Sequence, residues 1–481
     1  MSKDDTVSVL NLSAQNIGAG AVEALGSALR ASLSITSVDF SLNSELGDEG
    51  VEFLVPALRT DGTGISTIRV LSLMRCGIGE AGATALAQGL RGNSALEQLN
   101  LTGNFLGNAG VISLANSLVG SSRGFLLTLW LSSNRVGPAG AEGMAAALAK
   151  NPALQELHFS GNSLGDVGVA TLVRGAVQGQ GLRGLYVSGC GVGDTGAKEI
   201  ANALQASLHL ETLCLGYSAI GDDGASALTR VVAENHALRR LLLPCNCLRA
   251  AGGKAIAAML LSNRALLCLD ISNNQLGVTG LEAIARAVAK NTTLLELDLS
   301  GCGGTDASFR AVTKAVEANT TLGLLFCANN HLSSESLVEI EYALGRPKRT
   351  VRELVGQVQR SIDKQERLSR GGVKHSANDT GASHGGEPSV KLAPGQETSI
   401  QVSFGRKDNI VGNITVTNDT YLEEARTLID PLLRPSERTY GFLSTLGRVI
   451  PAEDEQARRV VWDCKFPIQL RPASWVAIGH S

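Results

Sequence analysis

Aliphatic side chains recur in a fixed frame along the first two thirds of the chain. One copy reads Leu96-x-x-Leu99-x-Leu101-x-x-Asn104-x-Leu106. The alternation of its leucines is typical of a short strand with one buried face. The frame then reaches a polar residue at the point where the end of a strand would leave backbone groups unpaired.

The polar position of this frame returns with a regular period. The steps between its copies are 28, 33, 28 and 30 residues, followed by seven steps of 28 residues. Such regularity indicates a structural repeat of twelve units. An Asn can satisfy the unpaired backbone groups, and a Cys fits the same slot as a small buried group with a weak donor. The twelve positions are Gln15, Asn43, Cys76, Asn104, Asn134, Asn162, Cys190, Ser218, Asn246, Asn274, Cys302 and Asn330.

A Gly-Asp-x-Gly phrase follows the frame, as at Gly165-Asp166-Val167-Gly168, and Ala and Leu then recur at helical spacing. The acidic residue suits a helix N-terminus, where the helix dipole favours an anion. Each unit is therefore predicted to contain one strand and one helix. Neither element can bury its apolar face alone, so the units must stack. We predict an α/β fold over residues 6–345: a horseshoe solenoid with a parallel inner sheet and outer helices.

The 28-residue period and the helical second half of each unit resemble the ribonuclease-inhibitor-like subclass of leucine-rich repeats. Members of that subclass include ribonuclease inhibitor, the Ran GTPase activator, innate immune sensors and several ciliary proteins. The resemblance implies that partners bind to the concave face. It carries no implication about which partner binds.

Two units depart from the period. The second unit has a loop at Thr60–Ser66, and the fourth has a two-residue insertion near Ser121–Gly124. Both insertions follow a predicted helix and precede a predicted strand, so they lie on one rim. One interpretation is tolerated loop variation, and the other is a rim that contacts a partner.

One residue of each predicted strand, between its last two aliphatic positions, should face the concave side. In three successive units this residue is Trp130, His158 and Tyr186, and after Cys214 the column continues with Leu242. Adjacent strands place such side chains about 5 Å apart. A row of exposed aromatic residues is typical of a binding surface. The alternative is that the rings only pack on one another across a tightly curved sheet.

Charged residues precede or begin the same strands and could form a rim around this patch. The protein-binding residues predicted from sequence are therefore Trp130, His158, Tyr186, Leu242, Glu156, Arg183, Glu211, Arg239 and Arg240.

Composition and charge narrow the class of function. Hydrophobic residues make up 44% of the chain but aromatic residues only 4%, which suits thin regular layers of Leu, Ala, Val and Ile. A net charge of −3 favours neither a nucleic acid nor an acidic membrane as partner. No apolar run is long enough to span a membrane, and the polar start at Met1–Thr6 does not resemble a signal peptide. We therefore expect a cytoplasmic protein with reduced cysteines.

No motif predicts catalysis or a cofactor. A Gly-x-x-x-x-Gly-Lys-Ser/Thr phosphate loop is absent, and the Gly-rich phrases belong to the repeat. The recurring carboxylates are explained as helix-start residues. Cys245 and Cys247 are separated by one residue, which is poor geometry for a structural zinc site, and a lone His158 predicts no metal. We expect neither an enzyme nor a metal site, and no arginine can be matched to the catalytic loop of a GTPase activator.

The last third of the chain has a different pattern. Residues 346–370 have a helical apolar stripe that includes Val351 and Leu354, which predicts a helix that caps the last unit or bridges to a partner. Residues 371–396 are rich in Gly, Ser, His and Pro and predict a flexible linker. Residues 397–475 alternate as two strands, a helix from Thr420 and further strands. This order resembles a small α+β ubiquitin-like domain.

Two functional hypotheses follow. The first is a non-catalytic scaffold that binds other proteins through the concave face and the C-terminal domain, within a ciliary or flagellar axonemal assembly of the cytoskeleton. It depends on the repeat subclass and on the phrase from Tyr440 to Pro451, which resembles small domains of flagellar proteins. The alternative is a soluble regulator of a small GTPase or signalling protein that uses the concave face.

Overall fold

A computed structural model describes residues 7–59, 66–119 and 126–345, together with five strands nearer the C-terminus. The chain divides into two units, Met1–Ala343 and Leu344–Ser481. The predicted helix at 346–370, the linker at 371–396, the helix from Thr420 and the two loop insertions lie outside the described residues.

The first unit is built from twelve strand–helix pairs in strict alternation. Every strand has three residues, and the helices have 11 to 14 residues. The pairs are β1 Val9–Asn11 and α1 Ala19–Ala31, β2 Ser37–Asp39 and α2 Gly47–Leu58, β3 Val70–Ser72 and α3 Glu80–Leu90, β4 Gln98–Asn100 and α4 Gly107–Val119, β5 Thr128–Trp130 and α5 Pro138–Leu148, β6 Glu156–His158 and α6 Gly165–Gln178, β7 Gly184–Tyr186 and α7 Asp194–Leu204, β8 Thr212–Cys214 and α8 Asp222–Val232, β9 Arg240–Leu242 and α9 Ala250–Ser262, β10 Cys268–Asp270 and α10 Gly277–Val288, β11 Glu296–Asp298 and α11 Asp306–Ala318, and β12 Leu324–Phe326 and α12 Ser334–Gly345.

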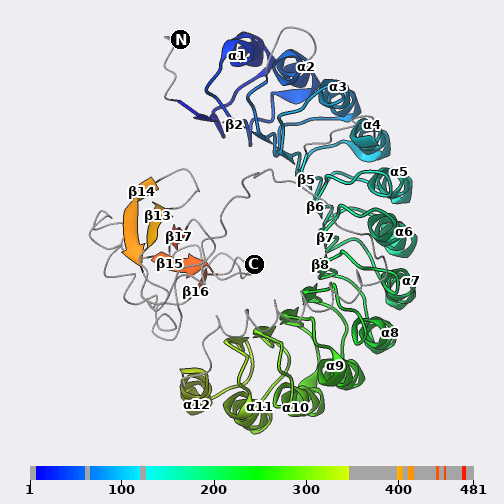
Figure 1. Cartoon of the computed structure of the whole chain (residues 1–481), viewed down its shortest axis with the longest axis vertical. Coiled ribbons are helices and arrows are strands. Elements are labelled where there is room, and N and C mark those ends of the chain that lie inside the picture. The colour runs from blue at the N-terminus through cyan, green and yellow to red at the C-terminus, as the bar shows by residue number, and fades with distance from the viewer. Residues whose placement is uncertain are drawn as a thin grey trace, which may run out of the picture. The chain divides into compact units, whose positions relative to one another are not determined.

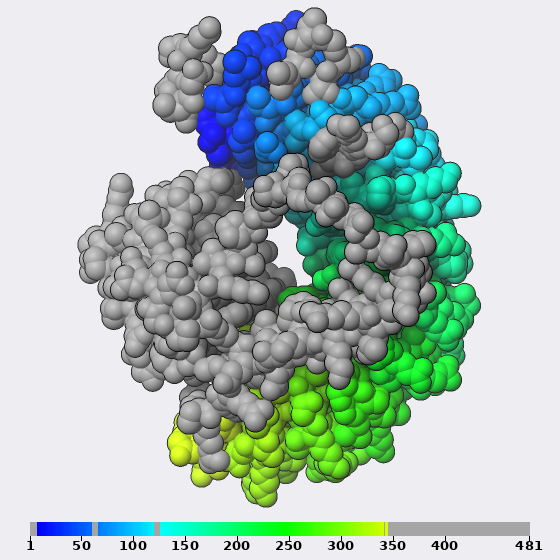
Figure 2. All heavy atoms as spheres, in the orientation of Figure 1, coloured from blue at the N-terminus to red at the C-terminus, as the bar shows by residue number. Residues whose placement is uncertain are grey.

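The twelve strands form one parallel sheet in sequence order. Figure 1 shows them along the inside of an arc, with helices α1 to α12 on the outside, and the outer sides of successive units abut one another in the space-filling view (Figure 2). Strands in a sheet lie about 4.8 Å apart, whereas packed helices need about 8–10 Å. Stacking strand on strand and helix on helix must therefore curve the solenoid toward its strands. The predicted α/β solenoid with parallel strands is confirmed.

The core lies between the sheet and the helices and consists of thin aliphatic layers. Leu157, Leu185 and Leu213 are the middle residues of successive strands, and all three are fully buried. In the helices that face them, Val169, Ile200 and Leu228 are buried as well. Each layer is covered by the next unit, which is why a single unit could not fold alone.

The repeated Asn joins neighbouring units at the end of each strand. The Nδ2 of Asn162 donates to the backbone oxygens of Phe159 in its own unit (2.8 Å) and Leu131 in the preceding unit (3.0 Å). Its Oδ1 accepts from the backbone N–H groups of Asn134 (2.9 Å) and Val136 (3.1 Å). One buried amide thus satisfies four backbone groups, three of which belong to the preceding unit.

Cysteine fills the same slot with fewer bonds. The thiols of Cys76, Cys190 and Cys302 donate to backbone oxygens of the preceding unit at 3.2 to 3.4 Å. Burial raises the pKa of Cys76 and Cys190 to about 11 and that of Cys302 to about 12. The thiols therefore stay protonated donors near neutral pH, as expected for the small weak donor predicted from sequence.

The residue after each of these cysteines is a glycine in the left-handed region. The φ angles of Gly77, Gly191 and Gly303 are 72°, 76° and 71°. The turn after a Cys therefore needs a conformation that glycine adopts without strain. Asn134 uses the same turn, since the residue after it, Arg135, has a φ of 58°. Asn134 also lacks the full set of Asn bonds: its Oδ1 is buried without a partner among the described residues.

The acidic residue of the Gly-Asp-x-Gly phrase acts on the next unit as well as on its own helix. Oδ1 of Asp194, in the first turn of α7, accepts from the backbone N–H groups of Gly221 (2.7 Å) and Gly224 (2.9 Å) at the start of α8. A Cβ on Gly224 would lie 2.6 Å from that oxygen. The second glycine of the phrase therefore makes room for the carboxylate of the preceding unit.

A second series of asparagines joins the units where each helix leads into the next strand. Asn291 donates through Nδ2 to the backbone oxygen of Leu260 (2.8 Å), and its Oδ1 accepts from the N–H groups of Thr293 and Leu294. The same bonds recur at Asn93, Asn151, Asn263 and Asn319. We did not predict this series, although the phrase Asn-x-x-Leu before the strand carries its signal.

Five strands are described in the C-terminal unit: β13 Thr398–Phe404, β14 Ile410–Val416, β15 Tyr440–Leu443, β16 Val449–Ile450 and β17 Ile468–Pro472. They form one sheet in the order β14-β13-β17-β15-β16. The pair β13 and β17 is parallel, and the other three pairs are antiparallel. The first and last strands of the unit are therefore neighbours at the centre of the sheet.

An Asn in the slot should contribute more to the free energy of unfolding than a Cys in the same slot. The substitution Asn162→Ala removes four hydrogen bonds and leaves their partners buried, so we expect the free energy of unfolding to fall by about 2–4 kcal/mol. Cys190→Ala removes one weak donor and a small volume, and we expect a loss of about 1 kcal/mol. Urea unfolding followed by circular dichroism measures both. An Asn162→Ala loss no larger than that of Cys190→Ala would contradict the assignment.

Candidate functional site

Three rings lie in one row on the inner face of β5, β6 and β7. The register pairs Trp130 with His158 and His158 with Tyr186 across neighbouring strands. The ring centroids of Trp130 and His158 lie 5.3 Å apart with their planes at 19°, and those of His158 and Tyr186 lie 4.1 Å apart at 5°. We call these three residues the aromatic stack. Its members lie side by side, whereas their role in binding stays a prediction.

The alternative interpretation of these rings, mutual packing, describes part of what the structure contains. His158 is covered on both faces by its neighbours, and its Nε2 lies 3.5 Å from a carboxylate oxygen of Glu156. All three rings are nevertheless only half-buried. Stacking therefore fixes the orientation of the rings, and each of the three residues keeps part of its surface exposed.

Gly184 makes room for the outermost ring of the stack. A Cβ on Gly184 would lie 3.2 Å from Cε2 of Tyr186 and 3.4 Å from Cγ of Glu156. The Tyr186 ring therefore leans over its own strand toward the first residues of the neighbouring strands. Burial raises the pKa of the Tyr186 phenol, and the nearby Glu156 carboxylate raises it further, whereas Arg240 and a hydrogen bond with Thr212 act in the opposite direction. The phenol accordingly stays protonated and can donate.

The charged residues of the predicted rim pair with one another across units. Arg183 and Glu211 form an ion pair of 3.1 Å between two half-exposed side chains. Arg239 in the next unit donates to the backbone oxygen of Ala265 at 3.0 Å, and burial lowers the pKa of its guanidinium. The three residues stand at the same position of successive units, so their charges alternate beside the aromatic stack. Exposed pairs of this kind contribute little to stability.

Beyond the stack the column becomes apolar. Cys214 and Leu242 are half-buried in β8 and β9, and the thiol of Cys214 lies 3.0 Å from the hydroxyl of Ser188. Leu242 is paired in register with Cys214, so it extends the stack along the same face. The four residues of the predicted patch therefore lie within the run of neighbouring strands from β5 to β9: Trp130 in β5, His158 in β6, Tyr186 in β7 and Leu242 in β9.

The same column has a local structural role at other strands. Oδ1 of Asn11, Asp39, Asn100, Asp270 or Asp298 accepts from the backbone N–H two residues later, at 2.8 to 3.0 Å. Strands β5 to β9 differ from these strands. Their residues of the same column, Trp130, His158, Tyr186, Cys214 and Leu242, have no carboxylate or amide oxygen for this bond.

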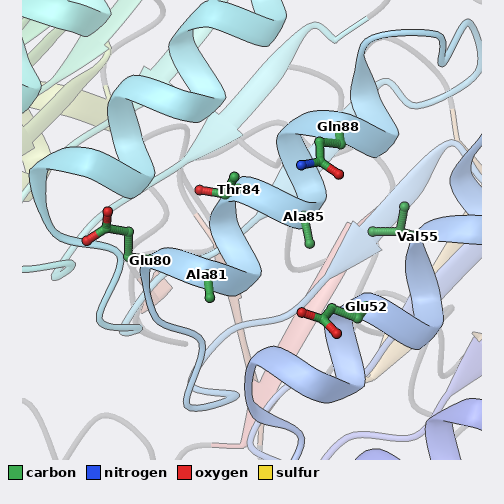
Figure 3. A pocket seen from close by; sticks show the side chains of 7 residues that line it. All are labelled: Glu52, Val55, Glu80, Ala81, Thr84, Ala85 and Gln88. Carbon is green, nitrogen blue, oxygen red and sulfur yellow. The ribbon is translucent and has the colours of Figure 1, made fainter.

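A groove on the outer helical layer is a weaker candidate. It lies between α2 and α3, has a volume of about 640 Å³, and is lined by Glu52, Val55, Glu80, Ala81, Thr84, Ala85 and Gln88. Figure 3 shows Glu52 and Val55 on α2 and the other five side chains on α3. The groove contains two carboxylates and a small apolar floor, which is usual between two solvated helices. Its polar side chains do not converge on a common point.

Within the described residues, His, Cys, Asp and Glu form no group of three that could hold a metal ion. Cys245 is half-buried and Cys247 is exposed in the turn after β9. None of the described helices is long and apolar enough to cross a membrane.

The chain is similar to several proteins of known structure at low identity. A structure of leiomodin-1 actin-binding site 2 is 24% identical with a TM-score of 0.24, and the match covers 31% of this chain and 82% of that one. A structure of the yeast Rad7 and Elc1 complex is 16% identical with a TM-score of 0.46, and the match covers 69% of this chain and 79% of that one. An internalin of Listeria monocytogenes is 18% identical with a TM-score of 0.38, and the match covers 67% of this chain and 92% of that one. No curated protein sequence matches the chain.

The family model described as Leucine Rich repeat matches eight segments of the solenoid. Each segment contains one strand of the inner sheet, and the units of β1, β5, β9 and β12 add four strand–helix pairs of the same kind. The matched segments are residues 31–55, 64–87, 92–115, 150–173, 182–201, 206–228, 262–285 and 290–303. The chain is therefore a leucine-rich-repeat protein whose repeats stack their strands into a parallel sheet.

Proposed function

We propose that this protein is a non-catalytic protein-binding scaffold whose partner binds to the concave face over strands β5 to β9. The observation that carries the proposal is the aromatic stack. Three half-buried rings hold one another in place at a column position where several other strands have Asn or Asp. Trp and Tyr are the residues that most often dominate the affinity of protein interfaces.

The fixed orientation of the three stacked rings favours binding energetically. A ring that is already fixed between two others loses little conformational freedom when a partner arrives, so less of the interaction energy is spent on ordering it. The half-exposed Glu156 and the Arg183–Glu211 pair lie beside the rings and can orient a polar segment of the partner. Leu242 and Cys214 continue the apolar surface for the core of the interface.

The double variant Trp130→Ala with Tyr186→Ala tests this site. Removing the two outer rings should weaken partner binding by at least about tenfold, because hot-spot side chains each contribute about 2 kcal/mol or more. Quantitative mass spectrometry of proteins that co-purify with the tagged full chain measures the loss. The matched control is Tyr217→Ala, which removes an aromatic ring that is 68% exposed in the turn after β8.

The fold of the double variant must be checked in the same experiment. Loss of the two stacked contacts should lower stability by about 1–3 kcal/mol, which leaves the solenoid folded and its far-ultraviolet circular dichroism unchanged. A folded double variant that keeps every partner of the wild type would contradict the proposal.

The C-terminal unit is proposed as a second binding module with a ubiquitin-like fold. The order β14-β13-β17-β15-β16, with the first and last strands parallel at the centre, supports this assignment because it is the strand order of a β-grasp sheet. Residues 397–475 would form this module, and residues 346–370 would form a helix that caps the last repeat or bridges to a partner.

The finer proposal is that the scaffold belongs to a ciliary or flagellar axonemal assembly. It depends on the phrase from Tyr440 to Pro451 and on the repeat subclass. Detergent fractionation of ciliated cells that carry the tagged protein tests it. We expect the protein to remain with the insoluble axonemes, because a structural component is held by many contacts at once.

Quantitative release into the detergent-soluble fraction would contradict the axonemal role. In that case a soluble partner, such as a small GTPase or signalling protein, becomes the occupant of the concave face, and the Trp130→Ala, Tyr186→Ala variant then reports on that complex. The wild-type fractionation thus tests the location, and the variant tests the site.

A further inference from the structure

An exposed cluster with a different chemistry lies on the turns that follow β3, β4 and β5. Arg75, Phe105 and Arg135 come from three successive units and all three are exposed. The guanidinium carbon of Arg135 lies 4.2 Å from the centroid of the Phe105 ring, which is the geometry of a cation–π contact. We call these three residues the rim cluster. The concave-face proposal does not use any of them.

The backbone under the rim cluster is held by bonds to both neighbouring units. Arg75 N–H donates to the oxygen of Thr102 (2.9 Å), Gly103 N–H to Ser132 (2.8 Å), and Phe105 N–H to Ile78 (2.7 Å). Gly103 leaves the space that Arg75 occupies, because a Cβ there would lie 2.8 Å from Cγ of Arg75. The three side chains are therefore presented by a rigid turn, with Arg75 lying across the same turn that carries Phe105.

Arg135 occupies a backbone conformation that costs energy. The other residues with positive φ at this position of the turn are Asn16, Gly77, Gly191 and Gly303. Asn and Gly adopt the left-handed region readily, whereas a long side chain there is strained. No hydrogen bond or ion pair of the described residues offsets this for Arg135. Strained residues of this kind occur where a side chain must be presented for function.

The charges of the two arginines are not neutralised locally. Neither Arg75 nor Arg135 forms an ion pair with another described residue, although four salt bridges join other basic and acidic side chains of the solenoid, at Arg69, Arg174, Arg183 and Lys198. Helices α4 and α5, which follow the turns of Phe105 and Arg135, have no acidic residue in their first turn.

At α4 the usual aspartate is replaced without loss of its hydrogen bonds. Oδ1 of Asn108 accepts from the N–H groups of Gly137 (2.7 Å) and Gly140 (3.1 Å), as Asp194 does for the next helix in its own part of the solenoid. The cap is kept and the negative charge is absent. Arg75 of unit three and Arg135 of unit five thus present positive charge from the units on either side of the exposed Phe105 ring.

We propose that the rim cluster is a second docking surface and that its occupant is an acidic peptide segment of a partner protein. Two guanidinium groups can each bind a carboxylate through paired N–H donors. The open face of Phe105 then packs against an apolar side chain or the stem of a glutamate next to those carboxylates. A carboxylate-bearing segment fits this surface because it supplies the opposite charge that the rim cluster itself lacks.

Selection from a random dodecapeptide phage library against the full chain tests the proposal. The wild type should enrich peptides with Asp and Glu next to an apolar residue, and a synthetic copy of an enriched peptide should bind measurably by fluorescence anisotropy. Binding should weaken by at least about tenfold in Arg75→Ala with Arg135→Ala, and it should weaken as salt rises from 0.1 to about 0.5 M. Phe105→Ala should also weaken binding.

Matched variants separate this surface from general charge and from the concave face. Arg286→Ala with Arg310→Ala removes two exposed arginines from α10 and α11 and should leave the affinity unchanged. Arg75→Lys with Arg135→Lys keeps the charge but loses the planar pair of donors, so its affinity should lie between those of the wild type and the alanine variant. Trp130→Ala with Tyr186→Ala should bind the peptide as the wild type does.

Two results would overturn the proposal. One is a selection without enrichment of acidic residues. The other is an acidic peptide whose affinity for the folded Arg75→Ala, Arg135→Ala variant equals its affinity for the wild type. Circular dichroism of each variant establishes that it is folded before the affinities are compared.

Discussion

The buried polar slot at the end of the strands, filled in most units by an Asn amide, is the feature on which the solenoid depends. A three-residue strand ends almost as soon as it begins, so every unit leaves backbone groups unpaired inside the molecule. An Asn such as Asn162 satisfies groups of two units at once, and it can do so only if the units are stacked at one fixed offset. The period of 28 residues expresses this requirement.

Residues of very different chemistry occupy equivalent positions where the side chain faces away from the core. The concave column illustrates this. At strands such as β2, β4 and β10 its residue bonds to its own turn, whereas at β5, β6 and β7 it is an aromatic ring that bonds to no backbone group of the turn. The turns after the strands are a second such position, and there Phe105 and Arg135 form their own contact. A regular scaffold thus holds two chemically different surfaces in fixed positions.

The repeat pattern predicted much of this architecture. The period predicted twelve units. The alternation predicted which residue of each strand faces the concave side, and Trp130, His158 and Tyr186 could therefore be expected to be neighbours. What the pattern could not predict depends on the geometry between units. The carboxylate of Asp194 caps the following helix, and Gly224 is small because of it. Such partners lie about one period apart, and only the stacked structure brings them together.

Cross-linking from the concave face tests the central claim most directly. A photoreactive amino acid placed at Thr128, in β5 on the same face as Trp130, should form cross-links to a partner protein in cells. The same amino acid at Arg286, on the outer helix α10, should form few or none. Cross-links of equal yield from both positions, or none from position 128, would contradict a partner bound over the aromatic stack.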